Sequence, residues 1–278
     1  MHSHQNRKDG PQRRRSETAG SSWGRGRLLL LLGGLVVASL LALAGMGLGI
    51  YYMLHPAHPG TAGRDHAGVA SSGGDARDRI AERPMPATDP DAARPGPLIT
   101  AKFAVLHLPA PKRLGPVGVS TGFPHTPGGA LAQLVAIDQA ALQSASVPVA
   151  QRVISAWAQP GGPTAQSWSG VKAIADMLGT AGLPATGSTD LAVSASPAMG
   201  LIKGTIGDNY VVGCVDFVVT ATASRTARTA AADCQRMVWS ATDARWLIGP
   251  GAEPAQPPSI WPGTEAARAA GYAQLSYE

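Results

Sequence analysis

The spacing of apolar residues in the middle of the chain predicts three successive helices. Thr126 followed by Pro127 is a helix-start signal, because Thr can cap the free amides of a first turn and Pro suits the first helical position. A second helix is expected after Ser146, and a third over 164–178. The residues of the first helix at near-helical spacing are Leu131, Leu134, Val135, Asp138, Ala141 and Leu142.

The pattern then changes from a helical period to extended segments. Residues 205–222 are rich in Val, Thr, Ile and Phe, a composition typical of strands. Further strands are expected at 235–239 and 244–248, and an earlier one within 191–203, broken at Pro197. Helices followed by strands predict an α+β domain over 101–278, in which helices pack on a curved antiparallel sheet of about four strands. A short helix is expected over 264–270.

A different pattern occupies residues 28–54, which are 27 residues without a charge. About 20 apolar residues suffice to cross the hydrocarbon core of a bilayer, so this segment predicts a single transmembrane helix and makes the lipid bilayer a partner. Trp23 precedes the segment, and Tyr51 and Tyr52 lie near its far end, where aromatic side chains suit the headgroup regions. The alternative is a signal peptide cleaved after Ala44, since Ala42-Leu43-Ala44 fits a cleavage site.

The charge distribution orients this segment. Residues 1–27 contain seven basic and two acidic residues, whereas 28–278 are balanced at 16 of each. The positive-inside rule therefore places the basic tail, 1–27, in the cytoplasm and the C-terminal domain outside the cell membrane. Because this outer part is neutral, we expect no direct contact with nucleic acid.

Residues 55–100 are rich in Pro and Gly and have no apolar run that could build a core. This composition predicts a disordered spacer between the membrane segment and the domain. His55, His58 and His66 lie in it, and we interpret them as bystanders rather than as metal ligands.

Three short motifs carry a resemblance to a known family. They are the segment 122–130 (Gly-Phe-Pro-His-Thr-Pro-Gly-Gly-Ala), the segment 238–247 (Val-Trp-Ser-Ala-Thr-Asp-Ala-Arg-Trp-Leu), and Trp261-Pro262-Gly263-Thr264 before Ala270-Gly271-Tyr272. With the N-terminal anchor, the chain resembles membrane proteins of mobile and conjugative elements from high-GC Gram-positive bacteria. Their outer domains are similar to the inner-membrane assembly factor of type IV secretion systems. The resemblance implies a ketosteroid-isomerase-like cone fold that acts as a scaffold.

Two motifs suggest catalysis, but each lacks the partners that the chemistry needs. Gly118-x-Ser120-x-Gly122 matches a nucleophile elbow, which requires a later His, and His125 is the last His of the chain. Ser169-x-x-Lys172 matches the penicillin-binding enzymes, but their companion motifs are absent. We therefore predict no catalytic residues, no cofactor and no metal site.

The acidic residues of the domain are dispersed. We expect helix-surface and turn positions for Asp176, Asp190 and Asp208. Asp216 lies inside an apolar strand and is the one acid with some prospect of acting as a functional base. Otherwise we expect it on a solvated strand face, with Arg236 as a candidate partner.

Cys214 and Cys234 are the two cysteines of the chain, and both are expected outside the cell, where disulfides persist. If the two strands pair so that residue numbers sum to 448, Cys214 faces Cys234. The same register places Val211 opposite Met237 and Phe217 opposite Ala231, all apolar. We therefore predict a disulfide, and two buried free thiols are the alternative.

The function expected from these features is that of a non-enzymatic single-pass membrane protein, a scaffold or assembly component of a conjugation or secretion apparatus. Its partners would be envelope proteins of that apparatus or further copies of the chain. The alternative is a tethered extracytoplasmic domain that binds a ligand or acts as an isomerase. An apolar cavity with convergent polar groups would favour the alternative, and a filled core would favour the scaffold.

Overall fold

The computed structural model of this chain describes residues 72–277. The expected basic tail, the apolar segment and the first part of the spacer lie outside these described residues. Within 72–277, no helix has the length and apolar character needed to cross a membrane.

The described residues form helices and strands in a mixed order. The helices are α2 (Ser72–Glu82), α3 (Pro127–Gln143), α4 (Val147–Trp157), α5 (Ser169–Thr180) and α6 (Glu265–Ala269), with short 3-10 turns η1 (Pro90–Ala93) and η2 (Pro116–Gly118). The strands are β1 (Val105–Leu108), β2 (Arg113–Leu114), β3 (Ser120–Thr121), β4 (Ala192–Ile206), β5 (Tyr210–Thr222), β6 (Thr226–Ser240), β7 (Arg245–Ile248) and β8 (Ala273–Tyr277).

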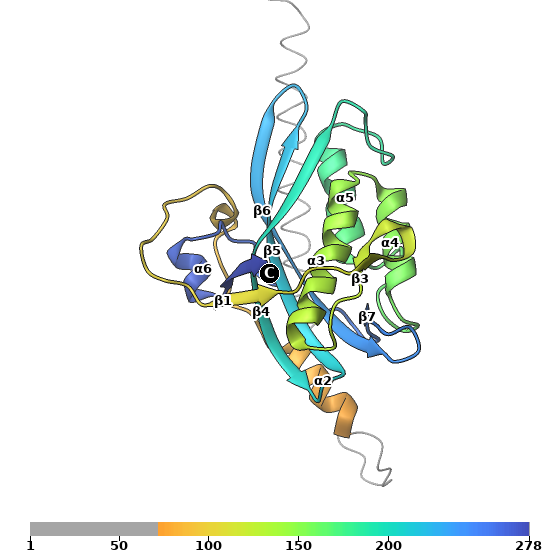
Figure 1. Cartoon of the computed structure of the whole chain (residues 1–278). Helices are drawn as coiled ribbons and strands as arrows, with labels where there is room; N and C mark the ends of the chain where they lie inside the picture. The colour runs from red at the N-terminus through yellow and green to blue at the C-terminus, as the bar shows by residue number, and fades with distance from the viewer. Residues whose placement is uncertain (1–71, 278) are drawn as a thin grey trace, which may run out of the picture. The chain divides into compact units, whose positions relative to one another are not determined.

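One sheet of six strands, in the order β1-β8-β4-β5-β6-β7, organises the domain (Figure 1). Its neighbouring strands are antiparallel except for the parallel pair of β1 and β8. The α+β class is therefore confirmed, whereas the expected number of about four strands is wrong. The two additional strands are short and far apart in the sequence, so no local pattern indicates that they pair.

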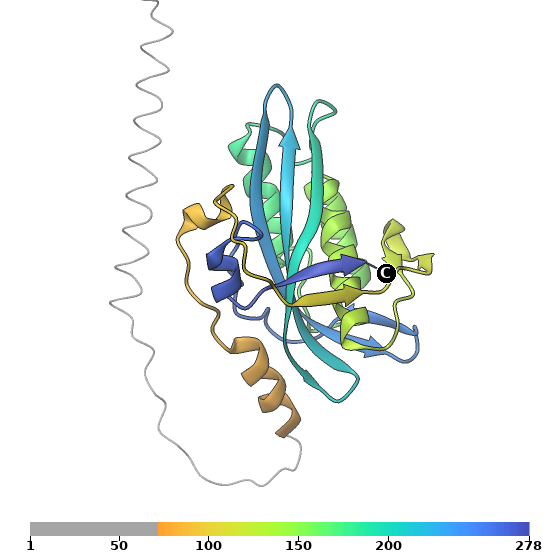
Figure 2. The ribbon, with the colours of Figure 1, turned by 60° about the vertical axis from the view of Figure 1, so that its left-hand side comes forward.

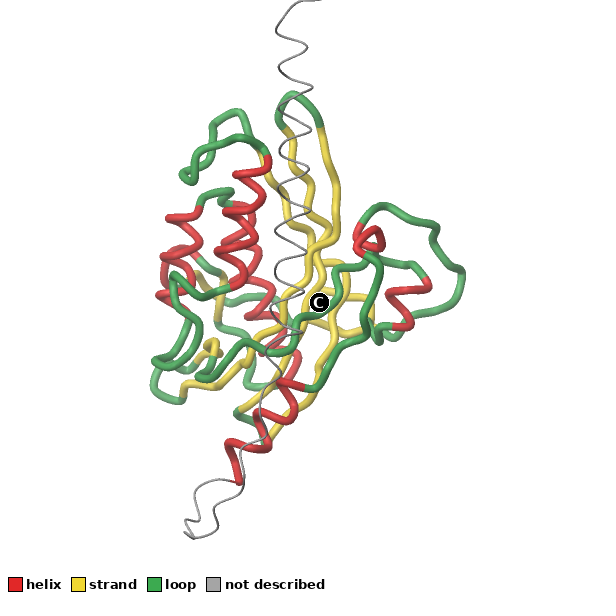
Figure 3. Tube along the Cα trace, turned by 180° about the vertical axis from the view of Figure 1, so that it is seen from behind, coloured by secondary structure: helices red, strands yellow, loops and turns green. Residues whose placement is uncertain are grey.

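Two layers cover the sheet, one on each face. Helices α3, α4 and α5 gather on one face, which is clear from the side and from behind (Figures 2 and 3). Strand β5 sends Val211, Val215 and Phe217 into the core beneath these helices. Its alternate residues Tyr210 and Val212 point to the other face, where they pack against α2. Strand β5 is thus buried on both sides, which explains its nearly continuous apolar sequence.

The helix starts predicted from the sequence are confirmed for the first two helices. Thr126 caps α3 through its side chain, which accepts a hydrogen bond from the amide of Gly129 at 3.1 Å. A Cβ atom on Gly129 would lie 2.0 Å from the carbonyl oxygen of Pro124, so the tight entry into α3 requires glycine there. Helix α4 begins after Ser146, as expected.

Two local expectations differ from the structure. Helix α5 starts at Ser169 rather than near Thr164, because the Thr164 side chain forms a turn with Ser167 before the helix. Strand β4 is not broken at Pro197 but continues through it, with a register shift between Pro197 and Met199. A bulge of this kind accommodates a residue that has no amide hydrogen for the ladder.

The disulfide between Cys214 and Cys234 is present, so this prediction is confirmed. The two residues are direct partners in the ladder of β5 and β6, with their Cα atoms 4.0 Å apart. Every pair of this ladder follows the predicted register, including Val211 with Met237. The alternation of apolar residues across the two strands was sufficient to specify the pairing.

Breaking this disulfide is expected to lower the free energy of unfolding by about 3 kcal/mol, because cross-linking residues 20 apart restricts the unfolded chain. Urea unfolding of the wild type and of the Cys214→Ala/Cys234→Ala variant measures the loss. A reductant should destabilise the wild type by a similar amount and leave the variant unchanged. Equal midpoints for the oxidised wild type and the variant would contradict the expected contribution.

The expected spacer, 55–100, differs from the structure over its described part. Helix α2 packs against the sheet through Ile80 and the fully buried Ala81, and Asp89 caps η1 by accepting a hydrogen bond from the amide of Asp91 at 2.8 Å. The segment contains too few apolar residues to predict this packing. Polar contacts supply most of the attachment, and these depend on residues more than 100 positions away.

Candidate functional site

The nucleophile elbow suggested by the sequence does not assemble. Ser120 lies in β3, where its carbonyl oxygen accepts a hydrogen bond from the side chain of Gln133 at 3.0 Å. His125 stacks instead on Trp239, with ring centroids 4.2 Å apart, and contacts Trp246 edge-on. The histidine is part of an aromatic cluster, which agrees with the expectation that this motif is not catalytic.

The Ser-x-x-Lys motif is also divided between two unrelated roles. The Nζ atom of Lys172 is exposed and pairs with Asp176 at 2.5 Å, along the surface of α5. The hydroxyl of Ser169 turns the other way and donates to Glu253 at 3.0 Å. Asp190 and Asp208 are exposed, so the surface and turn positions expected for these acids are confirmed.

Asp216 is fully buried, so the expected solvated position is wrong. The segment that follows β7 folds back over this face and covers it with Ile260 and Tyr272. The suggested partner is wrong as well, because Arg236 lies opposite Val212 in the ladder and bonds Asp78 at 2.8 Å.

Burial raises the pKa of the Asp216 carboxyl to about 8, and the backbone amide of Ile260 offsets only part of this effect. Among the described residues, neither carboxyl oxygen makes a well-formed hydrogen bond. Asp216 is therefore neutral at pH 7 and sealed beneath the covering segment.

A cavity of about 110 Å³ lies on the opposite face of the sheet, between α3, α5 and strands β5 and β6. Its walls are mainly apolar. The residues that line it are Asp138, Ala141, Leu142, Trp168, Ser169, Gly170, Ala173, Ile174, Phe217, Ala231, Ala232, Asp233 and Gln256. We regard this cavity as the candidate functional site, because apolar walls with a few polar groups are typical of small-molecule sites.

Two buried polar groups in the cavity wall have no hydrogen-bond partner among the described residues. Asp138, in the middle of α3, is 3% exposed, and both of its carboxyl oxygens are unpaired. Trp168, at the start of α5, is 2% exposed, and its indole N–H is unpaired. Buried polar groups normally find a partner, so two unpaired groups in one wall distinguish this site from the rest of the core.

A polar network closes one side of the cavity. The amide of Gln235 donates to Asp233 at 3.0 Å and to Glu253 at 3.0 Å. The hydroxyl of Ser169 bonds Glu253 at 3.0 Å and reaches Asp233 at 3.4 Å. The backbone amide of Ser169, in the first turn of α5, also points to Glu253, where the helix dipole favours a negative charge.

The carboxyl groups of this network influence the protonation of one another. Burial, followed by the charges of Asp233 and Glu253, raises the pKa of Asp138 well above its usual range. Burial likewise raises the pKa of Asp233 to about 6, although hydrogen bonds from Gln235 and Ser169 oppose the effect. The site can therefore hold a proton on Asp138 and present negative charge beside it.

The described residues contain no group of three or more His, Cys, Asp or Glu side chains placed to hold a metal ion. The carboxyl groups around the cavity are connected through Gln235 and Ser169 rather than converging on one point. The arrangement suits hydrogen bonding to a small molecule rather than metal coordination.

The sequence analysis missed this site, although a signal for Asp138 was present. Asp138 occupies an inward position of the first predicted helix, in series with Leu134 and Leu142. An acid at such a position of a buried helix is itself a reason to expect an unusual environment. Asp233 had no comparable signal, because the strand was expected to begin only at Gln235.

The two alternatives for function were to be separated by the core. Most of the space under the three helices is filled by buried apolar residues of α3, α4 and α5. The cavity is confined to one place and, at about 110 Å³, is small for a ligand pocket, since such pockets typically measure roughly 300–1,000 Å³. A substrate of the size of a steroid would not fit inside it.

Comparison of the chain with known protein families, with curated proteins and with solved structures finds no match.

Proposed function

We propose that this protein is a non-enzymatic, membrane-anchored scaffold or assembly component of a conjugation or secretion apparatus. The observation that carries the proposal is the attachment of α2 to the sheet. This helix is the first described element after the apolar segment, so its firm attachment would give the outer domain a defined connection to its anchor.

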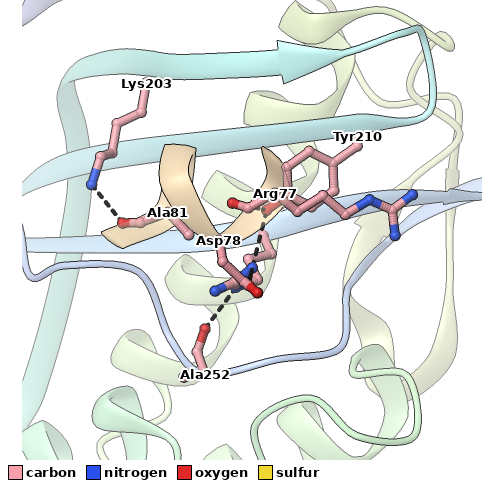
Figure 4. Close-up of polar contacts among 7 residues, drawn as sticks. Arg77, Asp78, Ala81, Lys203, Tyr210 and Ala252 are labelled. Carbon is pink, nitrogen blue, oxygen red and sulfur yellow. Dashed lines mark hydrogen bonds and ion pairs between the residues drawn. The ribbon is translucent and has the colours of Figure 1, made fainter. Parts of the chain in front are cut away.

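Strands β4, β5 and β6 each hold α2 through one side chain (Figure 4). The ammonium group of Lys203 donates to the carbonyl oxygens of Ala81 at 2.8 Å and Arg83 at 2.7 Å. A cation at the C-terminal end of a helix satisfies free carbonyls and complements the helix dipole. Arg83 returns a hydrogen bond to the backbone oxygen of Lys203, so the contact is reciprocal.

The other two contacts hold the middle of α2. Arg236 is 3% exposed and donates to Asp78 at 2.8 Å. The hydroxyl of Tyr210 donates to the backbone oxygen of Arg77 at 3.3 Å, and the Arg77 guanidinium lies 5.0 Å from the centre of the Tyr210 ring. Three strands thus hold one helix, which supports the view that α2 moves with the sheet rather than as part of a spacer.

This attachment would shorten the tether between membrane and domain. The expected transmembrane segment ends at Leu54 and α2 begins at Ser72, which leaves 17 residues between them. A fully extended chain of this length spans at most about 60 Å, at roughly 3.5 Å per residue. The outer domain would therefore stay near the bilayer, a position that suits an assembly component better than a freely swinging binding module.

Cross-linking in cells tests the proposal. We would place a photo-activated cross-linking residue at Leu114, which is 73% exposed, and as a control at the exposed Asp208 in the turn between β4 and β5. We expect adducts with envelope proteins of the transfer apparatus, or with a second copy, from position 114. Removal of residues 1–54 should abolish both these adducts and transfer activity. Full transfer activity of an exported chain that lacks 1–54 would contradict the proposal.

A further inference from the structure

The cavity beside Asp138 has a feature that a scaffold does not require. Its wall contains two unpaired polar groups, the carboxyl of Asp138 and the indole N–H of Trp168, both almost completely buried. Leaving such a group unpaired costs about 1–3 kcal/mol, so a molecule that pairs with these groups would bind favourably.

The charges around the cavity select the kind of molecule. Asp138 and Asp233 line it, and Glu253 lies directly behind Ser169. Among the described residues, the lining includes no Lys, Arg or His. The two charged groups that act on Asp138 are both acidic, so the site repels anions and attracts cations.

The apolar walls indicate what the rest of the molecule would be. The rings of Trp168 and Phe217 and the side chains of Leu142 and Ile174 surround the space. Aromatic faces attract organic cations, and aliphatic walls accept methylene groups. A cavity of about 150 Å³ is known to hold benzene, so the present volume of about 110 Å³ accepts a body of only a few carbon atoms.

We propose that this cavity is a binding site for small primary alkylammonium ions. The ammonium group would donate hydrogen bonds to Asp138, with Asp233 adding negative charge nearby. The short alkyl chain would lie against Ile174, Leu142 and Phe217. Glu253 and Gln235 hold Ser169 and Asp233 in place around the entrance, so the polar side of the site is formed before the ion arrives.

Titration calorimetry of the full-length protein with ethylammonium, ethanol and acetate tests this assignment. We expect ethylammonium to bind saturably, and ethanol and acetate to bind at least about tenfold more weakly, since a hydrogen bond to a charged group contributes roughly 1.5–3 kcal/mol. Equal binding of ethanol and ethylammonium, or no saturable binding of either, would overturn the proposal and identify the cavity as a site for water only.

Two variants of matched chemistry locate the binding. Asp138→Asn should weaken ethylammonium binding by at least about tenfold, because it removes the paired charge. Asp216→Asn should leave the affinity within about twofold, since Asp216 is equally buried but lies on the opposite face of the sheet. Unchanged binding by a folded Asp138→Asn variant would overturn the assignment. If that variant fails to fold, the comparison of ethylammonium with ethanol on the wild type still decides. Loss of the proposal would leave the cross-linking expected for the scaffold unaffected.

Discussion

Replacing Asp216 by Asn is expected to make the folded protein more stable at pH 8 and to have little effect near pH 4. Burial raises the pKa of this carboxyl to about 8 in the folded state, well above its usual value of 3.8. The folded state therefore binds the proton more tightly than the unfolded state does, and stability falls as the pH rises from about 4 to 8. Each pKa unit corresponds to about 1.4 kcal/mol, so the gain at pH 8 is at most about 5 kcal/mol.

Urea unfolding at several pH values between 4 and 8 measures this effect. Asp138 and Asp233 also have raised pKa values, so the Asp216→Asn variant keeps a part of the pH dependence. The titratable group that faces Asp216 from the covering segment is Tyr272, whose hydroxyl donates to the backbone oxygen of Pro258 at 3.0 Å.

Asp176→Asn serves as the control for the Asp216 experiment. Asp176 is exposed and paired with Lys172, and an exposed pair of this kind contributes only about 0–1 kcal/mol. Parallel stability curves for the wild type and Asp216→Asn would show that Asp216 does not carry the buried proton. Under the scaffold proposal, Asp216→Asn should also retain most of the biological activity, because no proton transfer is assigned to this residue.

Replacing Lys203 by Met is expected to release α2 from the sheet. The substitution keeps most of the apolar stem but removes two hydrogen bonds, to the carbonyl oxygens of Ala81 and Arg83. Each charge-assisted bond contributes about 1.5–3 kcal/mol, so the free energy that attaches α2 should fall by roughly 3 kcal/mol or more.

Limited trypsin digestion detects this release directly. Arg77, Arg79 and Arg83 are cleavage sites within or just after α2, and they should be cut faster in the Lys203→Met variant than in the wild type. Lys172→Met, which changes an exposed lysine of α5, is the matched control and should not alter the digestion. Unchanged protection of α2 in Lys203→Met would show that apolar contacts of Ile80 and Ala81 hold the helix without the lysine.

The parts of the fold that the sequence predicts are those with local signals. Thr126-Pro127 marks the start of α3, and alternating apolar residues around Cys214 and Cys234 specify the register of β5 and β6. The strands β1 and β8 have only four and five residues, and they pair across most of the domain. Nothing in either short segment indicates its partner, because the pairing depends on where the rest of the chain brings them.

The site was harder to predict for a related reason. An acid in the sequence carries no sign of what will cover it. Asp216 is buried by Ile260 and Tyr272, more than 40 residues later, and Asp138 acquires its neighbours Asp233 and Glu253 from about 100 residues later. The protonation and reactivity of these groups are set by tertiary packing, which an apolar pattern along one segment does not describe.

The position of β8 has a consequence for how the domain is made. Residues Ala273–Tyr277 lie between β1 and β4 and provide the ladder partners of Val105–Leu108. The edge that β1 needs therefore does not exist until about 165 later residues have been synthesised and, if the domain lies outside, exported. Contacts of such long sequence separation form slowly. During synthesis, β4 would present an unpaired edge to other chains, and this interval is when the domain is most open to misassembly or to a folding chaperone.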